Sequence, residues 1–240
     1  MTFKALLLAA GLGTRLKPLT NNIPKCLVRV GNEPILGIWL KNLSKAGCES
    51  VLINTHYLSN QVEDYLKKKD FGNMQIITSY EPKLLGTAGT LIQNANFFLG
   101  GNSMFIHADN FTTTNLQAFM HFHANNTVPK KKLLTMMTFE TDNPRSCGIV
   151  KVNKEGIVEK FYEKEKGEHG KIANAAVYCF DDNLIKYLLS ENKKLYDFST
   201  DVIPNILGKI QTYHTNSPFI DIGTLKSLKK ARNELKNLIS

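Results

Sequence analysis

A loop with two glycines follows the first apolar run of this sequence and could bind an anion. It extends from Ala9 to Lys25 and holds Gly11, Gly13 and Arg15. Glycines let the backbone approach a phosphate closely and direct N–H groups at its oxygens. A guanidinium adds a planar fork that matches phosphate, and an ammonium adds a point charge. Any tight turn also needs glycine, so the loop by itself is equally compatible with a plain turn.

Two common nucleotide-binding motifs do not fit this loop. The dinucleotide fingerprint requires a third glycine where Leu16 stands, and an acidic residue where Asn54 and Thr55 end the second predicted strand. The phosphate loop of NTPases requires a Gly-Lys-Ser/Thr sequence, which is absent. The loop therefore has to be interpreted from the residues around it.

Two aspartates follow short apolar runs later in the chain. Asp109 comes after the run that begins at Met104, and Asp221 follows Phe219 and Ile220. An isolated aspartate after a strand is usually a turn or a helix cap. As a pair, two carboxylates suit Mg²⁺, which takes one or two protein carboxylates together with water and substrate phosphates. The six histidines show no metal-binding spacing, and His107 is expected to be a packing or pocket-edge residue.

Apolar periodicity in the first half predicts strands that alternate with helices. The strands are expected over 4–9, 51–53, 75–77 and 104–106, and the helices over 34–46, 60–69 and 90–98. This alternation predicts an α/β fold with a doubly wound, largely parallel sheet. Ligands of such sheets bind beyond the carboxyl ends of the strands, where the glycine loop and Asp109 lie.

The second half predicts a smaller, more antiparallel lobe. Its strands are expected over 133–139, 148–152, 157–161 and 175–180, and its helices over 182–190, 200–207 and 224–238. The sequence shows no repeat and no proline-rich linker. We therefore expect residues 1–240 to form a single unit.

Composition and charge limit the class of protein. The chain has 240 residues, 42% hydrophobic, and a formal net charge of +9, which suits an anionic substrate or a nucleic acid. No basic patch is interleaved with aromatic residues, so we expect no nucleic-acid partner. Four scattered cysteines indicate reduced thiols and a cytoplasmic protein. No segment approaches the roughly 20 apolar residues of a membrane span, so no membrane partner is expected.

A series of short motifs resembles the sugar-1-phosphate nucleotidyltransferases in both content and order. They are Ala-Ala-Gly-Leu-Gly-Thr-Arg-Leu-Lys-Pro-Leu-Thr (9–20) with Pro-Lys (24–25), Glu-Pro (81–82) with Leu-Gly-Thr-Ala-Gly (85–89), Ala-Asp-Asn (108–110), Arg-Ser-Cys-Gly-Ile-Val (145–150), Glu-Lys (163–164), Asn-Ala-Ala-Val-Tyr (174–178) and Phe-Ile-Asp-Ile-Gly-Thr (219–224). The resemblance covers nearly the whole chain and is greatest to mannose-1-phosphate and heptose-1-phosphate guanylyltransferases. It implies a Rossmann-like mixed sheet and transfer of a nucleoside monophosphate from an NTP to a sugar 1-phosphate.

The resemblance also implies roles for particular residues. Arg15 would hold the departing β- and γ-phosphates, Lys25 the α-phosphate, and Asp109 and Asp221 a Mg²⁺ ion at the α-phosphate. The remaining nucleotide-binding residues would be Ala10, Gly11, Gly13, Thr14, Glu81, Gly86 and Thr87, and those for the sugar phosphate Gly148, Glu163, Lys164 and Asn174. Residues 1 to about 130 would then form the nucleotide-binding part, and about 131–240 the sugar-phosphate-binding part.

The charge of the acceptor determines the expected chemistry. A sugar 1-phosphate is a monoester with a second pKa of about 6, so it is mostly dianionic at pH 7. It can attack the α-phosphorus directly without a general base. The protein has to hold two anions in line and neutralise the accumulating charge.

The base and the sugar are less well determined by the sequence. A carboxylate at Glu81 could accept from both N–H groups on the Watson–Crick edge of guanine, which favours GTP, although a glutamate before proline is equally ordinary on a surface. Glu165 replaces the proline that usually follows Glu-Lys in the family, and Ala175-Ala176 replaces a pair that usually contains glycine. Cys147 stands where an aromatic residue is frequent, so the sugar stays open.

Three alternatives remain at this point. The Asp109-Asn110 pair also resembles phosphocholine cytidylyltransferases, although Glu163 and Asn174 argue against them. A uridylyltransferase acting on another phosphorylated acceptor belongs to the same group of alternatives. A non-catalytic regulatory relative would be expected to have lost part of the charged set, which is complete here: Arg15, Lys25, Asp109 and Asp221. Both a monomer and a homo-oligomer are compatible with the sequence.

Overall fold

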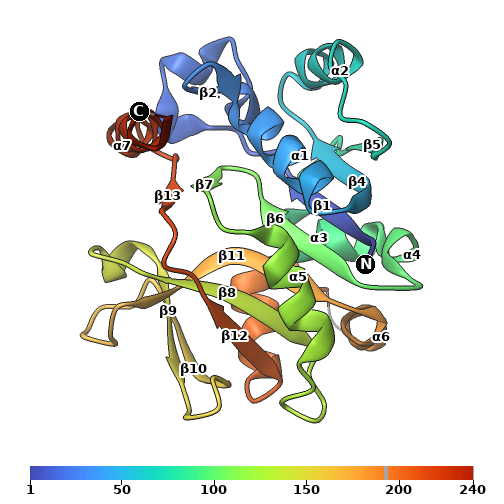
Figure 1. Cartoon of the computed structure of the whole chain (residues 1–240), viewed down its shortest axis with the longest axis vertical. Helices are drawn as coiled ribbons and strands as arrows, with labels where there is room; N and C mark the ends of the chain where they lie inside the picture. The colour runs from blue at the N-terminus through green and yellow to red at the C-terminus, as the bar shows by residue number, and fades with distance from the viewer. Residues whose placement is uncertain (192–193, 240) are drawn as a thin grey trace.

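A nine-stranded mixed sheet forms the centre of the molecule in the computed structural model, which describes residues 1–191 and 194–239. Four parallel strands form one half of the sheet in the order β6-β1-β4-β5 (Figure 1). Their bounds are Phe3–Leu8 for β1, Cys48–Thr55 for β4, Gln75–Tyr80 for β5 and Ser103–His107 for β6. The predicted parallel strands are confirmed.

The other half of the sheet is mostly antiparallel and is built around one long strand, β11 (Ile172–Phe180). Its second half pairs antiparallel with β6, and it also pairs antiparallel with β8 and β9. The bounds are Leu134–Glu140 for β8, Gly148–Val152 for β9, Val158–Glu163 for β10 and Ile210–His214 for β12. The predicted α/β class, with a more antiparallel lobe, is therefore confirmed.

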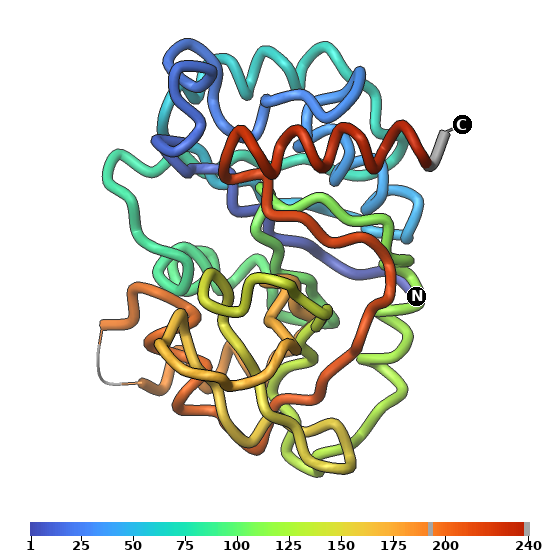
Figure 2. The backbone as a smooth tube through the Cα atoms, turned by 90° about the vertical axis from the view of Figure 1, so that its left-hand side faces the viewer, coloured from blue at the N-terminus to red at the C-terminus, as the bar shows by residue number. Residues whose placement is uncertain are grey.

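Helices cover both faces of the parallel strands, because side chains along each strand alternate between two hydrophobic clusters. One cluster contains residues of α1 (Ile35–Lys45), α2 (Ser59–Lys67), α5 (Leu116–Asn125) and α7 (Leu225–Ile239). The other contains residues of α3 (Gly86–Gln93), α4 (Ala95–Phe98) and α6 (Asp182–Ser190). In Figure 2 the chain leaves the lower lobe after β12 and rises to α7, which lies beside the N-terminal part.

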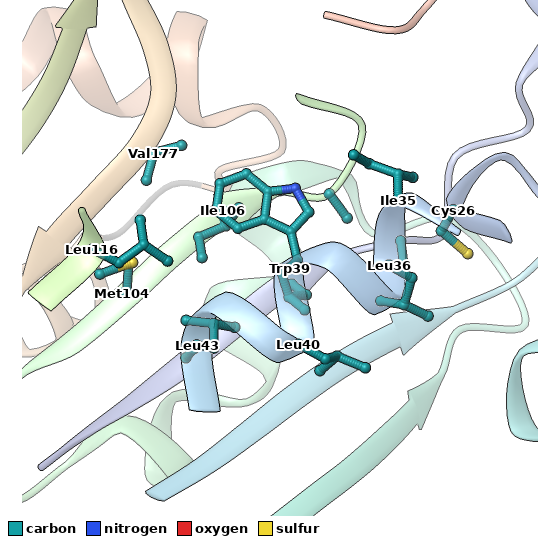
Figure 3. Packing of buried hydrophobic residues seen from close by; sticks show 14 of the residues in the cluster. Cys26, Ile35, Leu36, Trp39, Leu40, Leu43, Met104, Ile106, Leu116 and Val177 are labelled. Atoms are coloured by element: carbon teal, nitrogen blue, oxygen red, sulfur yellow. The ribbon is translucent and has the colours of Figure 1, made fainter. Parts of the chain in front are cut away.

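The largest buried side chain joins this packing to a functional segment. Trp39 of α1 is 1% exposed and lies among Leu36, Leu40 and Ile106 in the core (Figure 3). Its indole Nε1–H donates to the carbonyl of Asn110 at 2.8 Å. Because a buried indole N–H needs a partner, this bond fixes the chain directly after Asp109.

Small pairs of strands and short helices complete the chain. Strand β13 (Phe219–Asp221) pairs with β7 (Asn110–Thr112), and β2 (Arg29–Val30) pairs with β3 (Glu33–Pro34). Short 3-10 turns cover Thr14–Leu16, Leu19–Asn21, Lys25–Leu27 and Pro144–Ser146. In the described part of the chain, no helix has the length and apolar character that crossing a bilayer requires.

Two predicted helices differ from the structure. The helix expected over 90–98 begins earlier, at Gly86, and is divided at Asn94, whose side chain donates back to the carbonyl of Thr90. The helix expected over 200–207 is a π-helical turn at Phe198–Val202 followed by a 3-10 turn at Ile203–Ile206. Pro204 lacks an N–H, which explains why a regular helix does not run through this segment.

Candidate nucleotide and phosphate site

A pocket of about 220 Å³ opens at the carboxyl ends of the parallel strands. Its lining residues come from the ends of β1, β4 and β6 and the segments that follow them, from the 3-10 turn at Lys25–Leu27, from the loop after β5, from α3, and from Tyr196 in the second half of the chain. They are Leu8, Ala9, Ala10, Gly11, Lys25, Cys26, Asn54, Glu81, Leu84, Gly86, Thr87, Thr90, His107, Ala108, Asp109 and Tyr196. The pocket thus lies where ligands of doubly wound sheets bind.

Hydrogen bonds hold the glycine loop at its start and within it. The N–H of Ala9 donates to Asn54 Oδ1 at 2.7 Å, and the carbonyl of Gly13 accepts from the Thr20 hydroxyl at 2.7 Å. Gly13 has a φ of 65°, and a Cβ there would lie 3.0–3.1 Å from the side chains of Thr20 and Lys25. Glycine is therefore required at this turn for conformation and for space.

Lys25 and Asp109 form an ion pair inside the pocket. Burial is the largest influence on the pKa of Asp109 and raises it, but the charges of Lys25 and His107 together with hydrogen bonds outweigh burial and hold that pKa below its ordinary value. The carboxylate is thus charged at neutral pH. Burial lowers the pKa of the neighbouring His107, whose Nε2 has no partner among the described residues.

The backbone on either side of Asp109 is clamped. The N–H of Ala108 donates to Leu8, and the carbonyl of Asp109 accepts from the N–H of Ile222 at 2.9 Å. Asn110 is buried and donates to the carbonyl of Ala175. These bonds bring the segment after Asp221 next to the segment of Asp109, so the two carboxylates lie on adjoining strands, β13 and β7, or at their ends.

Arg15 and Asp221 lie at the open side of this region. Arg15 Nη2 is 3.8 Å from Asp221 Oδ2, and both side chains are more than half exposed. Asp221 also accepts from the N–H of Gly223, where a Cβ would lie 2.7 Å from the Arg15 guanidinium. Gly223 therefore leaves room for Arg15 beside the carboxylate.

The donor set at Asp109 and Asp221 fits Mg²⁺. Both groups are hard carboxylate oxygens, and the neighbouring cations Lys25 and Arg15 suit the phosphates that would complete the coordination shell. Among the described residues, no group of three or more His, Cys, Asp or Glu side chains is placed to hold a metal by itself. The two aspartates would therefore share the ion with substrate oxygens.

Glu81 differs from the ordinary surface glutamate that the sequence left open, because it is 2% exposed. Its Oε1 accepts from Asn54 Nδ2 at 2.9 Å and from the Thr90 hydroxyl at 2.5 Å, and its Oε2 accepts from the N–H of Leu85 at 3.1 Å. The carboxylate therefore organises the pocket wall before any ligand binds. Oε2 accepts one hydrogen bond where Oε1 accepts two, so Oε2 is the oxygen with more capacity to accept from a ligand.

The N-terminus of α3 is covered by a segment from the second half of the chain. The carbonyl of Tyr196 accepts from the N–H groups of Ala88 at 3.0 Å and Gly89 at 3.4 Å. The hydroxyl of Thr87 accepts from the N–H of Phe198 and donates to Asp197. The N–H groups of Ala88 and Gly89 at this helix end are therefore already paired within the protein.

The residues predicted for the sugar phosphate lie together outside this pocket. Gly148 and Glu163 are opposite each other on β9 and β10, and a Cβ at Gly148 would lie 2.6 Å from Glu163 Oε2. Lys164 Nζ is 3.0 Å from Glu163 Oε1. Asn174 donates to the Tyr178 hydroxyl at 2.7 Å and accepts from the N–H of Ala176 at 2.9 Å, so its amide already serves a bulge in β11.

The structure thus divides the predicted site residues into three neighbouring sets. The pocket contains Ala10, Gly11, Lys25, Glu81, Gly86, Thr87 and Asp109. Arg15 and Asp221 form a second set, and Gly13 and Thr14 lie in the turn that precedes and includes Arg15. Gly148, Glu163, Lys164 and Asn174 form the third.

Sequence reasoning missed several residues of the pocket wall, among them three polar ones. Asn54 was noted only because it is not acidic, and Thr90 and Tyr196 carried no motif. Their roles depend on contacts between residues far apart in the chain, so no local pattern would have found them.

Residues 4–237 match the nucleotidyl transferase family. The chain belongs to this family. The match covers both halves of the sheet and all three sets of site residues. It agrees with the resemblance that the motifs indicated.

Individual members of the nucleotidyl transferase family vary in the nucleotide they are named for. The chain is 32% identical over 229 residues to the mannose-1-phosphate guanylyltransferase catalytic subunit beta of Drosophila melanogaster, covering 93% of this chain and 60% of that protein. It is 27% identical over 258 residues to a UTP–glucose-1-phosphate uridylyltransferase of Synechocystis, covering 98% of this chain and 65% of that protein. The chain therefore spans about two thirds or less of the length of these relatives.

A solved structure of the same fold is HddC from Yersinia pseudotuberculosis complexed with GMP-PN. It superposes with a TM-score of 0.80 at 23% identity, covering 97% of this chain and 99% of that one. At this identity the likeness supports the fold.

Proposed function

We propose that this protein transfers a nucleoside monophosphate from an NTP, preferably GTP, to a sugar 1-phosphate and releases pyrophosphate. The observation that carries the proposal is the Lys25–Asp109 pair, which lies in the pocket beside the glycine loop. It places a cation and a carboxylate at the carboxyl end of the parallel strands, within one family whose members are named for such transfers.

Some residues of the site would position the substrates, and others would neutralise the charge that accumulates on the phosphates. Gly11 and Gly13 let the backbone approach the triphosphate, and Arg15 stabilises the departing β- and γ-phosphates. Lys25 stabilises the charge that develops on the α-phosphate. Because the acceptor phosphate is mostly a dianion at pH 7, it attacks the α-phosphorus in line without a general base.

Asp109 and Asp221 would hold Mg²⁺. The ion would supply electrostatic neutralisation of the phosphate oxygens during transfer. Lys25 must then exchange its present contact with Asp109 for one with the α-phosphate. This exchange keeps both charges of the ion pair neutralised when substrate binds.

The preference for GTP rests on Glu81 together with its neighbours. Glu81 lines the pocket, and its Oε2 accepts one hydrogen bond, from the N–H of Leu85, so we infer that it can also accept from an N–H on the Watson–Crick edge of guanine. Uracil and cytosine offer fewer such donors. The acceptor sugar would lie toward Glu163, with Lys164 meeting its phosphate.

The test is a pyrophosphate-release assay with Mg²⁺ over a grid of four NTPs and several hexose and heptose 1-phosphates. We expect turnover with GTP and at least one acceptor. Turnover only with CTP or UTP would overturn the guanylyl preference, and no turnover with any pair would overturn the transferase proposal for these acceptors.

Asp109→Ala tests the assignment of the site residues. We expect it to abolish turnover while a circular dichroism spectrum shows a folded protein. Asp64→Ala on the exposed face of α2 is the matched control and should keep wild-type turnover. Retained activity in Asp109→Ala would refute the metal assignment.

A further inference from the structure

One exposed aromatic side chain at the pocket has no role in the transfer described above. Tyr196 is 49% exposed, lines the pocket, and comes from the part of the chain expected to bind the sugar phosphate. A large apolar ring on a surface is unremarkable singly. Here, however, the ring lies at the mouth of a pocket for a ligand with a planar base.

The backbone of Tyr196 is held rigidly. Its N–H donates to Asp201 Oδ2 at 2.8 Å, and its carbonyl accepts from Ala88 and Gly89. Its neighbour Leu195 is buried, as is Phe198 two residues later. The ring is thus carried by a fixed segment between two buried anchors, so ordering it on ligand binding costs little conformational entropy.

Gly86 locates the ring within the pocket. A Cβ at Gly86 would lie 2.8 Å from two ring carbons of Tyr196, and Gly86 has a φ of 76°. The ring therefore packs directly on the first residue of α3, at the end of the pocket formed by Leu84 and Glu81. Lys25 and Asp109, which would meet the phosphates, line the same pocket from other elements.

We propose that Tyr196 is a nucleotide-binding residue whose ring packs against the base of the NTP at the mouth of the pocket. The inference rests on the proposed function, because it assumes an NTP in this pocket. Ring packing does not select one base, since every base has a π-face. It would therefore add affinity to the contact that Glu81 makes with the edge of the base. It also means that residues from both halves of the chain form the base site.

The test compares Tyr196→Ala, Tyr196→Phe and Leu189→Ala. Leu189 is an exposed apolar residue on α6, away from the pocket, and serves as the matched control. For each protein, KM for GTP, KM for the sugar 1-phosphate and kcat are measured, and GTP binding without acceptor is measured by calorimetry.

We expect Tyr196→Ala to raise Kd and KM for GTP by about 5- to 10-fold, the lower part of the range for loss of a base–aromatic contact. KM for the sugar phosphate and kcat should change less than twofold. Tyr196→Phe retains the ring and should recover most of the affinity, and Leu189→Ala should match the wild type.

Unchanged GTP affinity in Tyr196→Ala would overturn the inference, as would a rise confined to KM for the sugar phosphate. Equal weakening in Tyr196→Phe and Tyr196→Ala would also overturn it, because a hydroxyl contact and not ring packing would then be responsible. If the wild-type protein does not bind any NTP, the proposed function itself fails, which distinguishes the two outcomes.

Discussion

Replacing Glu81 by glutamine tests whether its carboxylate organises the pocket before ligand binds. The substitution keeps the shape of the side chain. Its amide oxygen can still accept from Asn54 and Thr90, but its NH₂ group then faces the N–H of Leu85, which now lies 3.1 Å from Oε2. One hydrogen bond is lost, a donor faces a donor, and the other two bonds lose their charge assistance.

We expect the free energy of unfolding to decrease by about 2 kcal/mol, because one buried unsatisfied donor costs roughly 1–3 kcal/mol. For a chain of this length this lowers Tm by roughly 4–8 °C. Scanning calorimetry without nucleotide measures the change, and Glu159→Gln, at an exposed position on β10, is the matched control. Surface changes of this kind usually stay within about 0.5 kcal/mol.

A wild-type Tm for Glu81→Gln without nucleotide would refute this reasoning. Glu81 would then act only on the ligand. The same variant should also raise KM for GTP, because an NH₂ group then replaces Oε2, the oxygen proposed to accept from guanine. A raised KM with an unchanged Tm would support the contact of Glu81 with the base and would contradict its structural role.

Two further predictions concern stability. Ala176→Gly should be more stable than Ala175→Gly by about 1–2 kcal/mol, because Ala176 has a φ of 51° that an L-residue adopts at that cost; differential scanning fluorimetry should show Tm values roughly 2–8 °C apart, and equal values would contradict the strain. Burial, with Lys132, lowers the pKa of His123 to about 3, so the unfolded chain takes up a proton near pH 6.5 while the folded chain does not. The contribution of His123 to stability is therefore complete above pH 6.5 and is lost as the pH is lowered below 6.5. Urea titrations should show that the free energy of unfolding decreases by about 2 kcal/mol less in His123→Asn than in the wild type between pH 7 and pH 5. An identical pH dependence in the variant would disprove this assignment.

The sequence predicts the parallel strands well because their signal is local. The continuous apolar run from Ala5 to Leu8 can only be buried on both faces, and β1 lies in the middle of the parallel strands. Helix α5 (Leu116–Asn125) was not predicted, since its two histidines, two phenylalanines and one asparagine are weak helix formers. Its helix is fixed instead by the Asn115 cap and by packing of Phe119 in the core.

The candidate site likewise contains residues that the sequence predicts and residues that only the structure identifies. The residues of the glycine loop could be recognised from their order, and so could Asp109. The absence of glycine from Ala175-Ala176 was visible too, but only the backbone shows that Ala176 retains the left-handed conformation that glycine would adopt freely. The network of Glu81 with Asn54 and Thr90 could not be predicted, because hydrogen bonds between distant residues depend on the packing of whole elements.

The position of strand β11 in the sheet matters while the chain is being translated. Its last four residues supply the partner of β6, although the other neighbour of β6, strand β1, is made first. A nascent chain that has not reached residue 172 therefore leaves one hydrogen-bonding edge of β6 open. Such edges associate readily with other strands. The parallel strands beside the pocket are translated early, but the ribosome must deliver residues 177–180 before that edge is covered.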